Sequence, residues 1–76
     1  RDYTQAAATF FEAYSKSPKG TKARDNLFKL GRSLARMDQK DDACASFDEL
    51  LAKFNEPADK AIRNRVMVDR TELGCQ

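Results

Sequence analysis

Apolar residues recur along most of this chain at intervals of three and four positions, which is the period of an amphipathic α-helix. The clearest run is the leucine series Leu27, Leu30 and Leu34, which has charged residues between its members. The pattern breaks at residues 17–20, at residues 38–40 and again just before Pro57. An all-α fold of about four antiparallel helices is therefore predicted.

The residues at these breaks indicate where each helix begins and ends. Helices are predicted over residues 3–16, 21–37, 41–54 and 57–73. Thr21 is the expected N-cap of the second helix, and Asp41 and Asp42 favour the positive end of the helix dipole in the first turn of the third. Pro57 suits the first turn of the fourth helix, and Gly74 suits its C-terminal cap.

One spacing pattern occurs once in full in the chain, and its second half occurs again upstream. The pattern consists of small and large apolar residues at fixed intervals. Its first half is Leu27-x2-Leu30-Gly31-x2-Leu34 and its second half is Ala43-x3-Phe47. The upstream match to the second half is Ala6-x3-Phe10. A shift of 37 residues superimposes residues 6–16 on residues 43–53. The pattern resembles the tetratricopeptide repeat (TPR), with leucine where that repeat prefers tryptophan and tyrosine.

The resemblance implies a single TPR-like domain over residues 1–76, an array of helical hairpins that is a fragment of a right-handed superhelix. Residues 1–20 then form the second helix of a truncated repeat, residues 21–56 a complete repeat and residues 57–76 a C-terminal capping helix. Small residues such as Gly31, Ala6 and Ala43 are expected to let neighbouring helices approach closely. The large apolar residues of the pattern are expected to fill the space between them.

The first helix is rich in aromatic residues, which are Tyr3, Phe10, Phe11 and Tyr14. Each repeat of such an array relies on its neighbours to cover its apolar face. An upstream helix or a second copy in a homo-oligomer is therefore expected to cover these aromatics. The alternative is that all four pack inward onto the second helix.

The composition indicates no catalytic centre. Of the 76 residues, 41% are hydrophobic and 34% are charged, with a net charge of +2. Histidine, a glycine-rich phosphate loop and a nucleophile motif are absent from the sequence, so neither an enzyme nor a cofactor site is expected. Two cysteines without histidine do not make a zinc site. The chain begins at Arg1 rather than Met and is expected to be a fragment or a processed product.

The two cysteines are expected to lie close together. Consecutive helices in such an array run antiparallel, so the start of the third helix lies beside the end of the fourth. Cys44 and Cys75 occupy these two places. We favour a disulfide between them, which would place the protein in an oxidising compartment. Two buried free thiols are the alternative, since free cysteine is often a core residue.

The run LFKLGRSLARMDQKDDACASFDELLAKF, followed by a polar last helix that ends at Leu73-Gly74-Cys75, resembles the C-terminal TPR domains of the CpoB (YbgF) family of the bacterial Tol–Pal system. The resemblance implies a non-catalytic periplasmic adaptor that follows a trimeric coiled coil, absent here. It also implies contact with TolA, through which outer-membrane constriction is coordinated with septal peptidoglycan synthesis in cell division.

In TPR arrays the first helix of each pair lines the concave surface, so the second helix here is the expected site of a binding groove. The candidate partner-binding residues are Asp25, Phe28, Lys29, Arg32 and Arg36. The three basic residues are spaced by three and four and share one face, which suits an acidic or amphipathic helical ligand. The alternative is a solvated charged face without a ligand.

Other functions stay open at this point. A different TPR adaptor, of the outer-membrane assembly or co-chaperone type, would bind a different peptide. Weak nucleic-acid binding is a further alternative, because the chain has 14 basic residues. Those of the last helix, however, are interleaved with acidic residues and form no uniform basic stripe.

Overall fold

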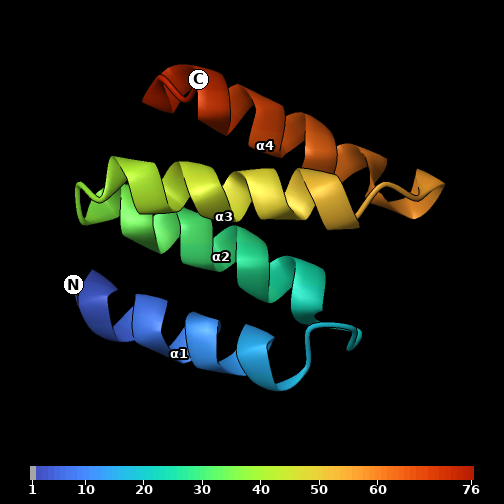
Figure 1. Ribbon diagram of the computed structural model, residues 1–76, viewed down its shortest axis with the longest axis horizontal. Coiled ribbons are helices and arrows are strands. Elements are labelled where there is room, and N and C mark those ends of the chain that lie inside the picture. Colours follow the sequence, from blue (N-terminus) through green and yellow to red (C-terminus); the bar gives the residue numbers. More distant parts are fainter. Residues whose placement is uncertain (1) are drawn as a thin grey trace.

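The computed structural model describes residues 2–76. In these residues the chain forms four α-helices and one short 3-10 helix, which are α1 (Tyr3–Lys16), α2 (Ala23–Arg36), α3 (Lys40–Lys53), η1 (Pro57–Asp59) and α4 (Lys60–Leu73). Consecutive helices run antiparallel and pack in chain order (Figure 1). The predicted all-α, TPR-like helical array is confirmed.

The predicted N-cap of α2 at Thr21 is wrong. The helix begins at Ala23, and no side chain of the described residues caps its first turn. Two consecutive backbone turns lead into the helix, because the Gly20 amide donates to the Ser17 carbonyl and the Ala23 amide donates to the Gly20 carbonyl. Thr21 lies inside the second of these turns, so it does not stand at the residue before the helix, where an N-cap belongs.

The other predicted helix boundaries lie within a few residues of the observed ones. α1 ends at Lys16, and α3 begins at Lys40, one residue earlier than expected. Pro57 begins η1 instead of α4 itself. Gly74 caps α4 in the left-handed conformation, with φ of 83°, and this is the conformation in which glycine has no steric cost.

The core is a continuous layer to which every helix contributes. Its buried apolar residues are Ala7 and Tyr14 from α1, Ala23, Leu27 and Leu30 from α2, Ala43, Phe47 and Leu50 from α3, and Val66 from α4. Leu34 and Phe10, which the repeat pattern also places between helices, are partly buried against this layer. The middle two helices therefore supply most of the buried side chains.

Gly31 allows α2 and α3 to approach more closely than any other residue would. A Cβ atom at this position would lie 2.5 Å from Cε1 and 2.8 Å from Cδ1 of Phe47. The Phe47 ring is itself only 1% exposed, so other residues cover it almost completely. The packing role predicted for glycine in the repeat pattern is thus explained by one aromatic ring.

The aromatic residues of α1 behave in different ways. Tyr14 is buried, Tyr3 and Phe10 are partly buried, and Phe11 is 60% exposed. The alternative that all four pack inward is therefore wrong. α3 has a helix on each side, whereas α1 packs mainly on α2 within the described residues and reaches α3 through Tyr14.

The expected close approach at Ala6 also differs from the structure. Ala6 is only partly buried, and its neighbour Ala7 takes the buried position. In the second repeat the equivalent residue, Ala43, is completely buried.

A polar cluster joins α1 to α3 at the edge of the core. The Tyr14 hydroxyl donates a hydrogen bond of 2.7 Å to Oε2 of Glu49, and Lys53 lies 3.3 Å from the same oxygen. Burial and the bond to Glu49 raise the pKa of Tyr14, while the donated hydrogen bond lowers the pKa of Glu49. Tyr14 therefore places its hydroxyl beside a charged partner while its ring stays in the core.

α4 is attached mainly by polar contacts, because Val66 is its only buried apolar residue. At its start, the guanidinium of Arg24 in α2 lies 2.6 Å from Oδ1 of Asp59. Nη1 of Arg63 donates two hydrogen bonds of 2.7 Å to the carbonyls of Leu51 and Phe54, at the end of α3. These contacts satisfy carbonyls that a helix end leaves free.

We predict that Gly31→Ala lowers the free energy of unfolding by about 1–3 kcal/mol. The energetic cost of the overlap between the new Cβ atom and the Phe47 ring exceeds the gain of about 1 kcal/mol in helix propensity. Urea unfolding followed by circular dichroism measures the change. In a Phe47→Leu background the same substitution should lower the free energy of unfolding much less, since the aromatic ring is no longer there. Equal costs in the two backgrounds would contradict the explanation.

We also predict a loss of stability in acid through Asp59. Hydrogen bonds from Arg24 and from the Glu56 amide lower the pKa of Asp59. A carboxyl with a lowered folded pKa stabilises the fold above its unfolded pKa of about 3.9, and this contribution is lost as the pH falls through the folded value. Asp59→Asn should therefore be less stable than the wild type at pH 7, and the difference should narrow below about pH 4.

Free energies of unfolding in urea at neutral and acidic pH test this prediction. The matched control is Asp25→Asn, which removes a carboxylate from an exposed pair within α2 and should change stability little. A difference between Asp59→Asn and the wild type that is the same at both pH values would show that Asp59 does not act through its charge.

Candidate protein-binding groove

The five residues predicted to bind a partner lie on α2, and the structure shows how each is held. Asp25 and Lys29 form an exposed ion pair of 3.1 Å within the helix. Phe28 is partly buried, with its ring centre 6.4 Å from that of Phe47. Arg32 and Arg36 are exposed. Asp25 is thus occupied by Lys29, and the two arginines provide the free positive charge of this face.

Each of the three cations on this face lies over an aromatic ring. Lys29 is 5.8 Å from the centre of the Phe10 ring, Arg32 is 5.5 Å from that of Phe28, and Arg36 is 5.5 Å from that of Tyr3. Such contacts stabilise by roughly 0.5–1 kcal/mol at exposed sites and restrict the side chain. Arg36 also donates a hydrogen bond of 3.1 Å to the Tyr3 hydroxyl. The cations are therefore held in place before any ligand binds.

Arg32 and Arg36 also line a groove between α2 and α4, which we call the α2–α4 groove. It has a volume of about 330 Å³ and is lined by Arg32, Ala35, Arg36, Phe47, Asp69, Glu72 and Leu73. Phe47 of α3 lies between the two walls, with Ala35 on one side and Leu73 on the other. The groove thus has an apolar middle, a basic wall on α2 and an acidic wall on α4.

The acidic wall was not predicted from the sequence. In the sequence, Asp69 and Glu72 indicate only that charges of both signs alternate along the last helix. The repeat pattern could have indicated this wall. α4 takes the place of the first helix of a following repeat, and the first helices of successive repeats line the same surface. Asp69 and Glu72 are three residues apart, so their carboxylates also share one face of α4.

The opposite charges of the two walls do not pair across the groove. Within residues 2–76, neither Arg32 nor Arg36 forms an ion pair with any carboxylate. Asp69 is paired only with Arg65 of its own helix, at 3.4 Å. The space between the walls is therefore bordered by charged groups that can interact with an incoming ligand.

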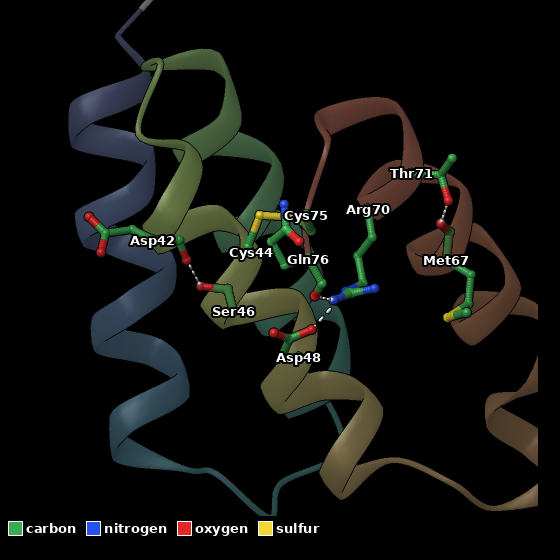
Figure 2. The surroundings of a disulfide bond; sticks show 9 residues. All are labelled: Asp42, Cys44, Ser46, Asp48, Met67, Arg70, Thr71, Cys75 and Gln76. Carbon is green, nitrogen blue, oxygen red and sulfur yellow. Dashed lines mark hydrogen bonds and ion pairs between the residues drawn. A yellow bond between two sulfur atoms is a disulfide. The ribbon is translucent and has the colours of Figure 1, made fainter.

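A disulfide between Cys44 and Cys75 holds the C-terminal end of α4 to α3 (Figure 2), with 5.7 Å between the two Cα atoms. Gly74 positions Cys75, because the Cys75 amide donates to the Arg70 carbonyl at 2.9 Å and so closes a Schellman motif at the helix end. Arg70 also reaches across to Asp48, at 2.7 Å. The acidic wall of the groove is thus attached to α3 by one covalent bond and one ion pair.

A larger cavity, of about 460 Å³, lies between α1 and α3. It is lined mainly by apolar side chains, which include the exposed Phe11 and the leucines Leu27, Leu30 and Leu34 of α2. Of its two carboxylates, Glu49 is engaged by Tyr14 and Lys53, whereas Asp42 is exposed and forms no ion pair within residues 2–76. The α2–α4 groove has charged groups of both signs and contains two of the predicted binding residues, so it is the better candidate site.

Residues 25–54 match a family model described as tetratricopeptide repeat. No curated protein and no solved structure matches the chain. The matched segment spans most of α2 and all of α3, the two helices joined by the contact of Gly31 with Phe47. Residues 25–54 thus match a TPR repeat, and such a repeat suggests a protein–protein interaction module.

No helix in residues 2–76 is both long enough and apolar enough to cross a membrane. In the same residues, the side chains of His, Cys, Asp and Glu form no group of three or more that could hold a metal ion.

We predict that Cys44→Ser with Cys75→Ser lowers the free energy of unfolding by about 3–4 kcal/mol, because the disulfide closes a loop across a sequence separation of 31. Urea unfolding of the oxidised wild type and the double variant measures the loss. Hydrogen exchange should quicken more in α4 than in α2, since α4 has the smaller share of the core. The reduced wild type should match the variant, and equal stability of the oxidised and reduced forms would contradict the prediction.

Proposed function

We propose that this domain is a non-catalytic periplasmic adaptor that binds an acidic helical segment of a partner protein on the basic face of α2. The observation that carries the proposal is the pair Arg32 and Arg36. Both are exposed, each lies over an aromatic ring, and neither is paired with a carboxylate of the described residues. The TPR-type fold favours a protein partner over a small molecule.

The chemistry of this face suits a helix. Lys29, Arg32 and Arg36 are spaced by three and four, so they form one row along the helix surface. A carboxylate row on a partner helix has the same spacing and can meet them together. The exposed edges of Phe28 and the other stacked rings add apolar area that the partner can bury. Charge then guides association, and burial adds affinity.

The disulfide supports the periplasmic part of the proposal. Structural disulfides persist in oxidising compartments such as the bacterial periplasm and are rare in the cytosol. In the proposed role the partner is TolA of the Tol–Pal system, and the adaptor coordinates envelope constriction with peptidoglycan synthesis in cell division. The support for this partner is the resemblance of residues 27–54 and of the Leu73-Gly74-Cys75 ending to the CpoB family.

A binding titration tests the proposal. The oxidised domain is titrated with the helical periplasmic segment of TolA from the same organism, by calorimetry, at low and at moderate salt. We predict saturable binding that weakens with salt and that falls at least tenfold in the variant Arg32→Glu with Arg36→Glu. Circular dichroism of the variant shows whether its helices are intact.

The matched control is Lys19→Glu with Lys22→Glu, which makes the same change in net charge at exposed residues outside the groove. This control should retain nearly all of the affinity. If both double variants weaken binding equally, the effect is one of net charge and the assigned face is wrong. If the wild type does not bind, TolA is not the partner.

A further inference from the structure

We propose that the α2–α4 groove recognises a bipolar helix, one with an acidic edge, an apolar centre and a basic edge, and that Asp69 and Glu72 are the residues that select the basic edge. The proposal rests on the proposed function, because it takes the partner to be a helix bound at Arg32 and Arg36. It adds a specificity that the basic face alone does not provide.

The state of Asp69 is the first observation that supports this role. Its side chain is only 12% exposed, and its oxygen Oδ2 is fully buried without a hydrogen-bond partner among residues 2–76. Its other oxygen, Oδ1, is 3.4 Å from Nε of Arg65. Because burial without a donor is costly for a carboxylate, a cation brought into the groove would stabilise Asp69 through its charge at short range, without a direct bond to Oδ2.

The arrangement of charge around the groove is the second observation. Arg32 and Arg36 stand on one wall, Asp69 and Glu72 stand on the other, and Phe47 lies between them. A ligand with acidic residues alone would satisfy the arginines but would bring like charge against the α4 wall. A ligand with a lysine or arginine on its far edge would satisfy both walls at once.

The third observation is that the two walls are held apart. The polar contacts of Arg63 and Arg70 and the Cys44–Cys75 disulfide attach α4 to α3, and the close contact at Gly31 attaches α2 to α3. Both walls are thus fixed to the same central helix. The groove therefore keeps its width.

Two synthetic helical peptides of equal length test the proposal. Both carry a row of glutamates on one edge and leucines along the centre. The bipolar peptide has lysines on the other edge, and the acidic peptide has glutamines there. We expect the bipolar peptide to bind the oxidised domain about tenfold more tightly than the acidic peptide, in fluorescence anisotropy titrations at the same salt concentration.

The variant Asp69→Asn with Glu72→Gln should lose this preference and bind the two peptides equally. The matched control, Glu12→Gln with Asp41→Asn, neutralises two exposed carboxylates outside the groove and should keep the full preference. Because a purely structural role of Asp69 would affect both peptides alike, the ratio of the two affinities separates recognition from stability.

The outcomes also separate this proposal from the one on which it rests. In one outcome, the acidic peptide binds the wild type as tightly as the bipolar peptide, and the variant Arg32→Glu with Arg36→Glu binds neither. The assignment of the binding site to the basic face is then correct, and the acidic wall has no role in recognition. If the variant of Asp69 and Glu72 keeps the preference, the selecting residues are misassigned. If neither peptide binds the wild type, both proposals fail.

Discussion

The contact of the Phe47 ring with Gly31 is the constraint on which the core and the groove both depend. A Cβ atom at Gly31 would lie 2.5 Å from the ring, so α2 and α3 can pack as closely as they do only with glycine there. The same ring lines the α2–α4 groove and contacts Phe28. Because Arg32 follows Gly31 directly and Arg36 lies about one turn further on, the contact also sets the direction of the basic wall.

The attachment of α4 follows a different principle. With Val66 as its only buried apolar residue, the helix is positioned by specific partners instead of by a broad apolar face. Arg63 binds the carbonyls at the end of α3, Arg70 binds Asp48, and the disulfide joins the far end. Such directional contacts fix the position of a helix while leaving most of its surface polar. The last helix can therefore present carboxylates to the groove without losing its place.

The sequence predicts the number and order of the helices, because the apolar period and the Pro and Gly breaks are local signals. It also pairs Cys44 with Cys75, since antiparallel neighbours bring these two positions together. The Thr21 cap fails because backbone turns compete with side-chain caps at a helix start. The stacking of Arg36 on Tyr3 and the unpartnered oxygen of Asp69 depend on side-chain conformations across two helices, and no spacing rule contains that information.

The separation of charge across the groove results from competing contacts of the charged side chains. Opposite charges in a narrow space attract, and flexible arginines could bridge to Asp69 or Glu72 if nothing else held them. Arg36 is hydrogen-bonded to Tyr3, Arg32 lies over Phe28, and Asp69 is paired with Arg65. Each of these three groups thus has another neighbour that opposes bridging. A ligand then meets the charges of the two walls already separated and does not have to break an ion pair between the walls before it enters, which lowers the cost of binding.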